Sequence, residues 1–390
     1  MDPATIGLFG VASVSSLFMA WVIGAGSSGA TPFAPAVGAN AISTLRAALV
    51  VGILGFLGAV TQGGNVSEAV GSGLVDGVTL PPTGVIAVLL IGAGLMAIGI
   101  RTGYPIATAF TVTGAVIGVG LALGGDPAWA KYHEVGALWV LTPIGGGAVA
   151  FAIARTLPRP DVPEDLSVPI LAALVGAVVV NLEFAFLGSM GGTVAAAGGR
   201  VVPLGDGLSV PLFTAFAGVL GALVVRWDIG RDLTGGLRRF LLALGSLVAF
   251  SAGASQVGLA VGPLLPLFEG QSIVPTFAIL LGGGLGMLVG SWTGAPRMIT
   301  ALSQEYASLG PRRSIATLVP SFLIAQLAVL LGVPVSFNEI IVSGIVGSGL
   351  AVGGADVSRR KLVVTVLAWI GSLALSLGLG YGTVLVFGIT

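Results

Sequence analysis

The sequence predicts an all-α, multi-pass membrane protein built from two inverted repeats of transmembrane helices, with broken helices and re-entrant hairpins. Three observations lead to this prediction. Of the 390 residues, 55% are hydrophobic and only 8% are charged, with a mean hydropathy of +1.06, whereas soluble domains carry about 25% charged residues. Apolar runs of bilayer-spanning length recur along the chain. A broken apolar segment occurs twice, each time at the same distance from a glycine-rich motif.

Composition also excludes several classes of function. Basic and acidic residues balance at 16 each, so no nucleic-acid partner is expected. The chain has no cysteine, and His133 is its only histidine, which argues against disulfides, haem, zinc and other metal sites. No nucleophile paired with a base stands out, so the protein is not expected to be an enzyme and no cofactor is expected. The first apolar run lacks a basic leader and a clear cleavage site, and we expect it to be retained as a span.

The apolar runs predict ten membrane-spanning helices, because about 20 apolar residues cross a bilayer. Three further stretches are too short or too interrupted for simple spans, and a fourth, 253–267, continues a span across a glycine-rich break. The final run is long enough for a tilted span or for a span plus a re-entrant segment. The ten ranges are 5–25, 45–62, 84–101, 137–155, 168–190, 208–226, 239–252, 274–291, 315–332 and 362–388, and the three interrupted stretches are 26–40, 103–124 and 334–354.

The chain divides into an N-terminal transmembrane repeat over 1–165, connecting helices over 166–238 and a C-terminal transmembrane repeat over 239–390. The connecting region ends in RWDIGRDLTGGLRR, the densest basic loop in the chain. Short basic loops favour the cytoplasmic side of a membrane. We therefore expect this loop to face the cytoplasm.

A duplication is visible directly in the sequence. TGYPIATAFTVTGAVIGVGLALGG, which starts at Thr102, matches LGVPVSFNEIIVSGIVGSGLAVGG, which starts 229 residues later at Leu331, at eight of 24 positions. GAGSS at Gly24 and GASQV at Gly253 are separated by the same 229 residues. Because two separate pairs share one offset, we predict two related halves. Inverted halves are favoured, with parallel repeats as the alternative.

A helix break repeated inside a membrane indicates a binding site. Backbone groups freed by a break must be satisfied by protein or by a watery cavity. The N-terminus of a half-helix carries free amides and partial positive charge, so it binds anions without a basic side chain. Paired broken segments in two halves are typical of transporters. The hydroxyls of Thr108 and Ser336 follow the breaks and would add donors. The alternative is a proline kink with hydroxyls bonded to their own helix.

At these residues the chain resembles the inorganic phosphate transporter (PiT) family of anion permeases, as a divergent member. Each half of that family carries a GANDVANA-type signature followed by a P-V-S-T-T-H segment. The corresponding stretches are WVIGAGSSGATPFAPAVG (21–38) and FSAGASQVGLAVGP (250–263), then GYPIATAF (103–110) and GVPVSFNE (332–339). The resemblance covers most of the chain in the right order. It implies a secondary transporter of inorganic phosphate, with sulfate or another oxyanion as alternative cargo. A gated anion channel is the alternative of another class.

The resemblance implies a substrate site built from hydroxyls and amides. Of the family's phosphate-binding hydroxyls, the first segment keeps Thr108 and the second keeps Ser336. Asn338 would donate an amide N–H where the family has a hydroxyl. The residues expected to line the opposing breaks are Ser27, Ser28, Ser255 and Gln256.

The coupling ion is less clearly implied. The family's sodium-binding asparagine and aspartate fall on Gly26 and Ser27 in one half, and on Ser255 and Gln256 in the other, so both carboxylates are missing. Glu339 stands where the family has histidine. Burial and a bound anion both favour the protonated acid, so Glu339 is a candidate for proton coupling. The alternatives are that Glu339 only caps free helix amides, that weak sodium coupling remains, or that transport is uncoupled.

One carboxyl outside these segments is a further candidate functional group. Glu183 lies within the apolar stretch VVVNLEFAFLG, and an ionisable group in such a run is a functional hypothesis by default. The alternative is a carboxyl paired with Asn181 or placed at the membrane interface.

We expect the whole protein to lie in the lipid bilayer of the cell membrane, and a homodimer is one arrangement left open.

Overall fold

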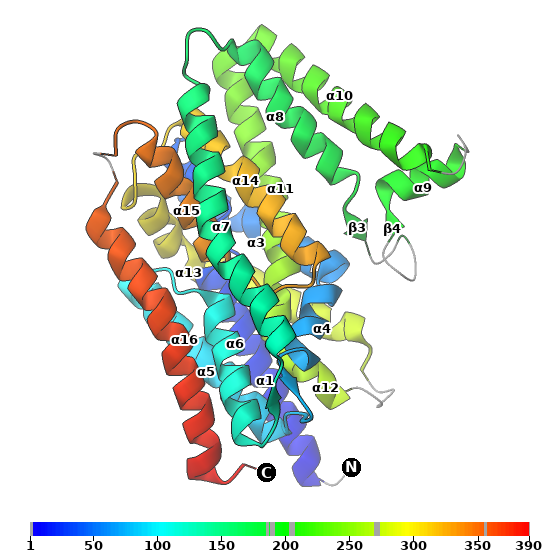
Figure 1. Ribbon diagram of the computed structural model, residues 1–390, viewed down its shortest axis with the longest axis vertical. Coiled ribbons are helices and arrows are strands. Elements are labelled where there is room, and N and C mark those ends of the chain that lie inside the picture. Colours follow the sequence, from blue (N-terminus) through cyan, green and yellow to red (C-terminus); the bar gives the residue numbers. More distant parts are fainter. Residues whose placement is uncertain are drawn as a thin grey trace.

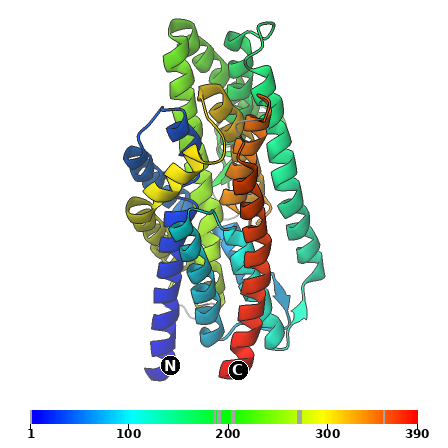
Figure 2. The ribbon, with the colours of Figure 1, turned by 90° about the vertical axis from the view of Figure 1, so that its left-hand side faces the viewer.

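The computed structural model describes residues 3–184, 187, 192–202, 207–268, 274–354 and 357–389. Within these ranges, nine helices are long and apolar enough to cross a membrane. They form an elongated bundle with both chain termini at the same end (Figure 1, Figure 2). The predicted all-α, multi-pass class is confirmed.

The N-terminal half contains a long first helix, a break, and later a short helix that begins inside the bundle. A pair of two-residue strands, antiparallel to each other, closes the loops around the short helix. The elements are α1 (Pro3–Gly26), α2 (Ala34–Gly38), α3 (Thr44–Gln62), α4 (Gly64–Ser72), β1 (Val75–Asp76), α5 (Pro82–Thr102), α6 (Thr108–Ala122), β2 (Asp126–Pro127) and α7 (Trp129–Thr156).

A connecting region and the C-terminal half follow. In the connecting region α8 and α10 pack on each other and lean away from the bundle (Figure 1). The elements are α8 (Glu164–Val179), β3 (Glu183–Phe184), β4 (Gly192–Thr193), α9 (Val194–Val201), α10 (Ser209–Arg231), α11 (Leu233–Val261), a 3₁₀ turn (Gly262–Leu264), α12 (Leu265–Phe268), α13 (Thr276–Gln304), α14 (Pro311–Leu330), α15 (Phe337–Leu350) and α16 (Arg359–Phe387).

The two halves make reciprocal contacts, as two-fold related units do. α6 packs on α16, and α15 packs on α7. At the repeat-equivalent glycines the backbones nearly touch: a Cβ would lie 2.2 Å from the Leu377 carbonyl oxygen at Gly118, and 2.1 Å from the Gly147 oxygen at Gly347. Figure 1 shows α1 rising from the lower end and α11 descending from the upper end. Opposite directions are expected of an inverted pair.

Most predicted spans coincide with helices, but two expectations were wrong. The run 168–190 forms a helix only over Glu164–Val179, and residues 185–186 and 188–190 lie outside the described part of the chain. The helix ends before Asn181, whose side chain instead donates to the Ala177 carbonyl and to Thr214. For the last run, of the two alternatives left open, the structure has the single span, α16, which is one continuous helix.

The break expected at Gly253 does not occur. α11 continues through this residue as far as Val261, and a single 3₁₀ turn follows. A Cβ at Gly253 would lie 1.8 Å from the carbonyl oxygen of Gly55 on α3. The glycine therefore permits close helix packing, which is its common use in membrane helices.

Candidate functional site

Two non-helical tips meet in the interior of the bundle, one before α6 and one before α15. Gly103 ends α5 with a φ of 72°, and Gly332 follows α14 with a φ of 60°. Glycine adopts this left-handed conformation without steric cost. Pro105 and Pro334 follow two residues later and cannot donate a backbone hydrogen bond. The sequence thus stops each helix and starts a new one a few residues on.

A tryptophan from the opposite half binds each tip. The Nε1 of Trp139 on α7 donates to the Pro334 carbonyl at 3.0 Å. The Nε1 of Trp369 on α16 donates to the Pro105 carbonyl at 2.7 Å. The Trp139 ring also stacks on Phe110 of α6, with centroids 3.9 Å apart. Each half therefore fixes the position of the other half's tip.

The two tips are also bonded directly to each other. Asn338 in the first turn of α15 donates its amide N–H to the Ile106 carbonyl at 2.6 Å. Ser336 caps α15 and accepts from the Glu339 backbone N–H at 3.5 Å. Asn338 Oδ1 and Glu339 Oε2 are buried without a hydrogen-bond partner among the described residues. We call the two tips and the residues bonded to them the centre. Buried polar atoms without partners are rare in folded proteins, so the start of α15 is the part of the centre whose hydrogen bonding is incomplete.

The two signature segments meet the second tip. Ser27, the first residue after α1, donates its hydroxyl to Gln256 Oε1 at 3.1 Å. The Gln256 amide in turn donates to the Val335 carbonyl at 2.7 Å. Ser27 and Gln256 are repeat-equivalent residues, and their contact is the kind that forms on a two-fold axis. The broken α1, the unbroken α11 and the tip of α15 are thereby joined.

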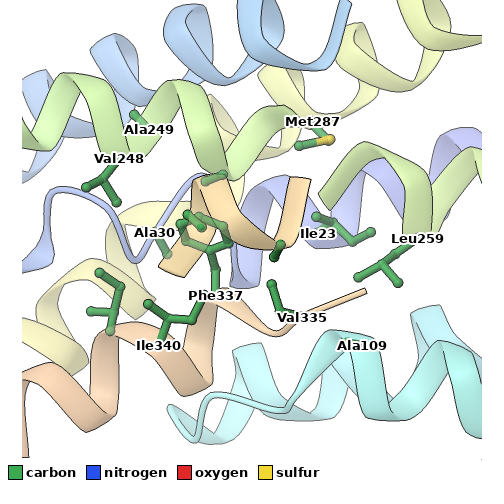
Figure 3. Packing of buried hydrophobic residues seen from close by; sticks show 14 of the residues in the cluster. Ile23, Ala30, Ala109, Val248, Ala249, Leu259, Met287, Val335, Phe337 and Ile340 are labelled. Carbon is green, nitrogen blue, oxygen red and sulfur yellow. The ribbon is translucent and has the colours of Figure 1, made fainter. Parts of the chain in front are cut away.

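The centre is closed to solvent. Figure 3 shows Ala30, Val335 and Phe337 in the apolar packing around it. All eight residues predicted from the sequence have an exposed fraction of 2% or less, namely Ser27, Ser28, Thr108, Ser255, Gln256, Ser336, Asn338 and Glu339. The conformation is therefore occluded, with access from neither side.

Three of the predicted residues are buried near the breaks without joining this network. The Thr108 hydroxyl contacts the Met96 sulfur at 3.5 Å. Ser28 lies just after α1 and donates weakly to the Ile23 carbonyl of that helix, at 3.5 Å. The Ser255 hydroxyl has no partner in the described ranges. The structure thus brings together Ser27 with Gln256, and Ser336 with its neighbours in α15, but it leaves Thr108 facing a thioether.

The electrostatics of the centre come almost entirely from neutral dipoles. In the segments 24–31, 103–110, 253–263 and 332–339, Glu339 is the only charged residue. An anion placed here would meet the N-termini of α6 and α15, together with hydroxyl and amide donors. Ser27 and Gln256 bond to each other, and neither is a carboxylate, so the signature positions do not supply the negative charge that a sodium ion prefers.

A closed centre between two broken segments from related halves defines a class: the secondary transporters with discontinuous helices. The chain belongs to the phosphate transporter family, whose model matches residues 23–380. It is 27% identical over 377 residues to a "putative phosphate permease" of Pyrococcus abyssi, covering 91% of this chain and 92% of the relative.

Two further comparisons agree with this membership. The chain is 24% identical over 410 residues to the chloroplastic inorganic phosphate transporter 2-1 of Arabidopsis thaliana, covering 90% of this chain and 68% of the relative. A solved structure described as "The sodium-dependent phosphate transporter" superposes with a TM-score of 0.81 at 23% identity, covering 98% of this chain and 99% of the other. That likeness establishes the fold. Family membership also indicates a transporter, not an enzyme.

Proposed function

We propose that the protein is a carrier that moves inorganic phosphate across the cell membrane, and that the substrate binds between the tips of α6 and α15. The observation that carries this proposal is the direct bond from Asn338 to the Ile106 carbonyl, which closes two helix N-termini over one buried centre. Opening that bond would expose helix amides to an anion entering from one side. A centre without basic side chains binds the anion moderately, which lets it leave again.

Substrate contacts are assigned to the donors at the tips. Ser336 and Asn338 would turn toward the anion once the tips separate, and Thr108 would exchange its thioether contact for a phosphate oxygen. A hydrogen bond to a charged group contributes about 1.5–3 kcal/mol, or roughly ten- to a hundredfold in affinity. The remaining lining groups are proposed to be Ser27, Ser28, Ser255 and Gln256.

Glu339 is proposed to couple transport to a proton. Its carboxyl is 1% exposed, and one of its oxygens has no hydrogen-bond partner in the described part of the chain. A bare carboxylate beside an anion would repel it, whereas the protonated acid could donate to it. Sodium coupling is the second candidate, because a protein of similar fold is described as sodium-dependent. A homodimer is also proposed as the oligomeric state of the protein.

The proposal is tested with purified protein in vesicles that contain unlabelled phosphate, to which labelled phosphate is added outside. A carrier gives saturable uptake and accumulates label by counterflow, with competition by excess sulfate reporting selectivity. Flux proportional to concentration would indicate the channel alternative, and no phosphate flux would contradict both. Thr108→Val and Ser336→Ala should each weaken apparent phosphate affinity about tenfold. Unchanged affinity in both variants would refute the assigned contacts.

A further inference from the structure

A second polar cluster lies outside the centre, in a cavity between α3, α8, α10 and α14. The cavity has a volume of about 420 Å³. Its apolar walls come mainly from leucines and valines of α8 and α14, and its polar side from five residues. Glu183 lies in β3, about midway along the long axis of the molecule (Figure 1). The polar lining residues are Gln62, Asn181, Glu183, Thr214 and Gln326.

Glu183 is the ionisable residue among the described residues that line this cavity, and it is half-buried. Its backbone carbonyl accepts the Gln62 amide N–H at 2.6 Å, which ties β3 to the end of α3. Among the described residues, no basic side chain forms an ion pair with Glu183. An ionisable group at membrane depth is costly unless it binds a proton or an ion or meets a charged partner. The carboxyl is therefore unexplained by the packing of the fold.

Residues with neutral side-chain oxygens line the same cavity. Gln62 is 7% exposed, and its Oε1 is buried without a donor in the described ranges. Asn181 uses its amide N–H groups on the Ala177 carbonyl and on Thr214 Oγ1, at 2.8 and 2.7 Å. The amide oxygen of Asn181 and a lone pair of the Thr214 hydroxyl thus remain available as acceptors. One carboxylate with several neutral oxygens suits a hard cation.

We propose that Glu183, Gln62, Asn181 and Thr214 form a binding site for a monovalent cation of the sodium type. A single carboxylate balances a single positive charge, whereas calcium and magnesium sites use several carboxylates or a bound phosphate. The cation would satisfy both the buried Gln62 oxygen and the Glu183 charge. This site is separate from the pair Ser27 and Gln256, whose side chains bond to each other.

A line of polar groups connects the cavity with the transport centre. Gln326 on the cavity wall donates to the Ser251 hydroxyl on α11 at 2.6 Å. Ser255 follows one helical turn later on the same face of α11, and its buried hydroxyl lacks a partner in the described ranges. Gln256 of the centre is adjacent. A cation in the cavity would thus lie beside the helix that binds the second tip.

The test is equilibrium binding of radioactive sodium to purified full-length protein without phosphate, with choline chloride keeping the ionic strength constant. Wild type should show saturable binding. Glu183→Gln should weaken it at least tenfold, and Thr214→Val, which preserves side-chain shape, about three- to tenfold. Asp161→Asn is the matched control, because Asp161 is an exposed acid in the α7–α8 loop, and it should bind sodium as wild type does.

Gln256→Leu distinguishes this site from the centre. The proposal expects sodium binding to survive in Gln256→Leu. If Gln256→Leu lost sodium binding while Glu183→Gln and Thr214→Val both kept it, the ion would lie at the centre and the proposal would be overturned. Absence of saturable sodium binding in wild type would also overturn it. Phosphate counterflow is measured separately, so failure of this site would leave the transport assignment standing.

Discussion

The tips before α6 and α15 follow similar backbone paths but carry different side chains. At repeat-equivalent positions the first tip, 107–110, has the sequence Ala-Thr-Ala-Phe, and the second tip, 336–339, has the sequence Ser-Phe-Asn-Glu. Both are preceded by a proline whose carbonyl accepts an indole N–H from the other half. The first tip contributes a backbone carbonyl, at Ile106, to the bond that joins them, whereas the second contributes a side chain. The backbone paths and the tryptophan contacts are alike at the two tips, whereas the side chains that the tips carry are different.

The signature segments show the same division. α1 breaks before Ser27, which leaves open backbone with a short hydroxyl side chain. α11 does not break, and the longer Gln256 side chain reaches both Ser27 and the Val335 carbonyl from an intact helix. The polar side chains thus come mainly from the C-terminal segments, whereas the N-terminal segments contribute mainly backbone and short side chains.

The largest effect is expected where the two tips are bonded. Asn338→Leu removes the donor to the part-buried Ile106 carbonyl, which costs about 1–3 kcal/mol, and it also removes a proposed substrate donor. Phosphate uptake in vesicles should fall about a hundredfold. Ser343→Ala on the same helix is the control, because its hydroxyl bonds only the Ile340 carbonyl, and it should lower uptake less than about twofold. Uptake within threefold of wild type in Asn338→Leu would contradict the central role of this bond.

Substitutions of the two signature residues, Gln256 and Ser27, should lower phosphate uptake by different amounts. Gln256→Leu removes two hydrogen bonds, and Ser27→Ala removes only one of them. With roughly 1 kcal/mol per neutral bond, uptake should fall about thirtyfold for Gln256→Leu and about fivefold for Ser27→Ala. Both losses are measured as initial rates of phosphate uptake at subsaturating phosphate. Equal losses would show that the Val335 contact contributes nothing.

The smallest and most symmetric effect is expected at the tryptophans. Trp139→Phe and Trp369→Phe each remove one indole N–H from a proline carbonyl but keep an aromatic ring in place. We expect similar decreases in the midpoint of thermal unfolding in detergent, and at most a threefold loss of uptake for each. A large effect in only one variant would show that the tryptophan contacts of the two tips are not alike.

The breaks before α6 and α15 could be predicted because glycine and proline act locally on the backbone. The break expected at Gly253 could not be distinguished from a packing contact, since the carbonyl of Gly55 that requires the glycine lies on a distant helix. The same limitation applies to the tryptophans. Their roles depend on carbonyls about 200 or more residues away, and they are 230 residues apart, which a search at the 229-residue offset misses.

The contacts of the eight proposed site residues could not be predicted from the sequence. All eight residues are buried, yet the contact of Thr108 with Met96 and the bond from Gln256 to Val335 depend on how the halves dock. The stretch around Glu183 could not be placed from its apolar pattern. There α8 ends at Val179, and Glu183 lies in a short strand beside a cavity instead of within a span.

The most direct test of the account asks whether Glu339, the one acid among the tip residues, couples phosphate to a proton. Labelled phosphate uptake into vesicles is measured with an imposed pH gradient, acidic outside, and separately with an imposed sodium gradient, for wild type and Glu339→Gln. We expect wild type to accumulate phosphate from the pH gradient. We expect Glu339→Gln to lose this accumulation but to keep counterflow exchange, since glutamine mimics the protonated acid. Equal accumulation by the variant, or wild-type accumulation from the sodium gradient alone, would contradict it.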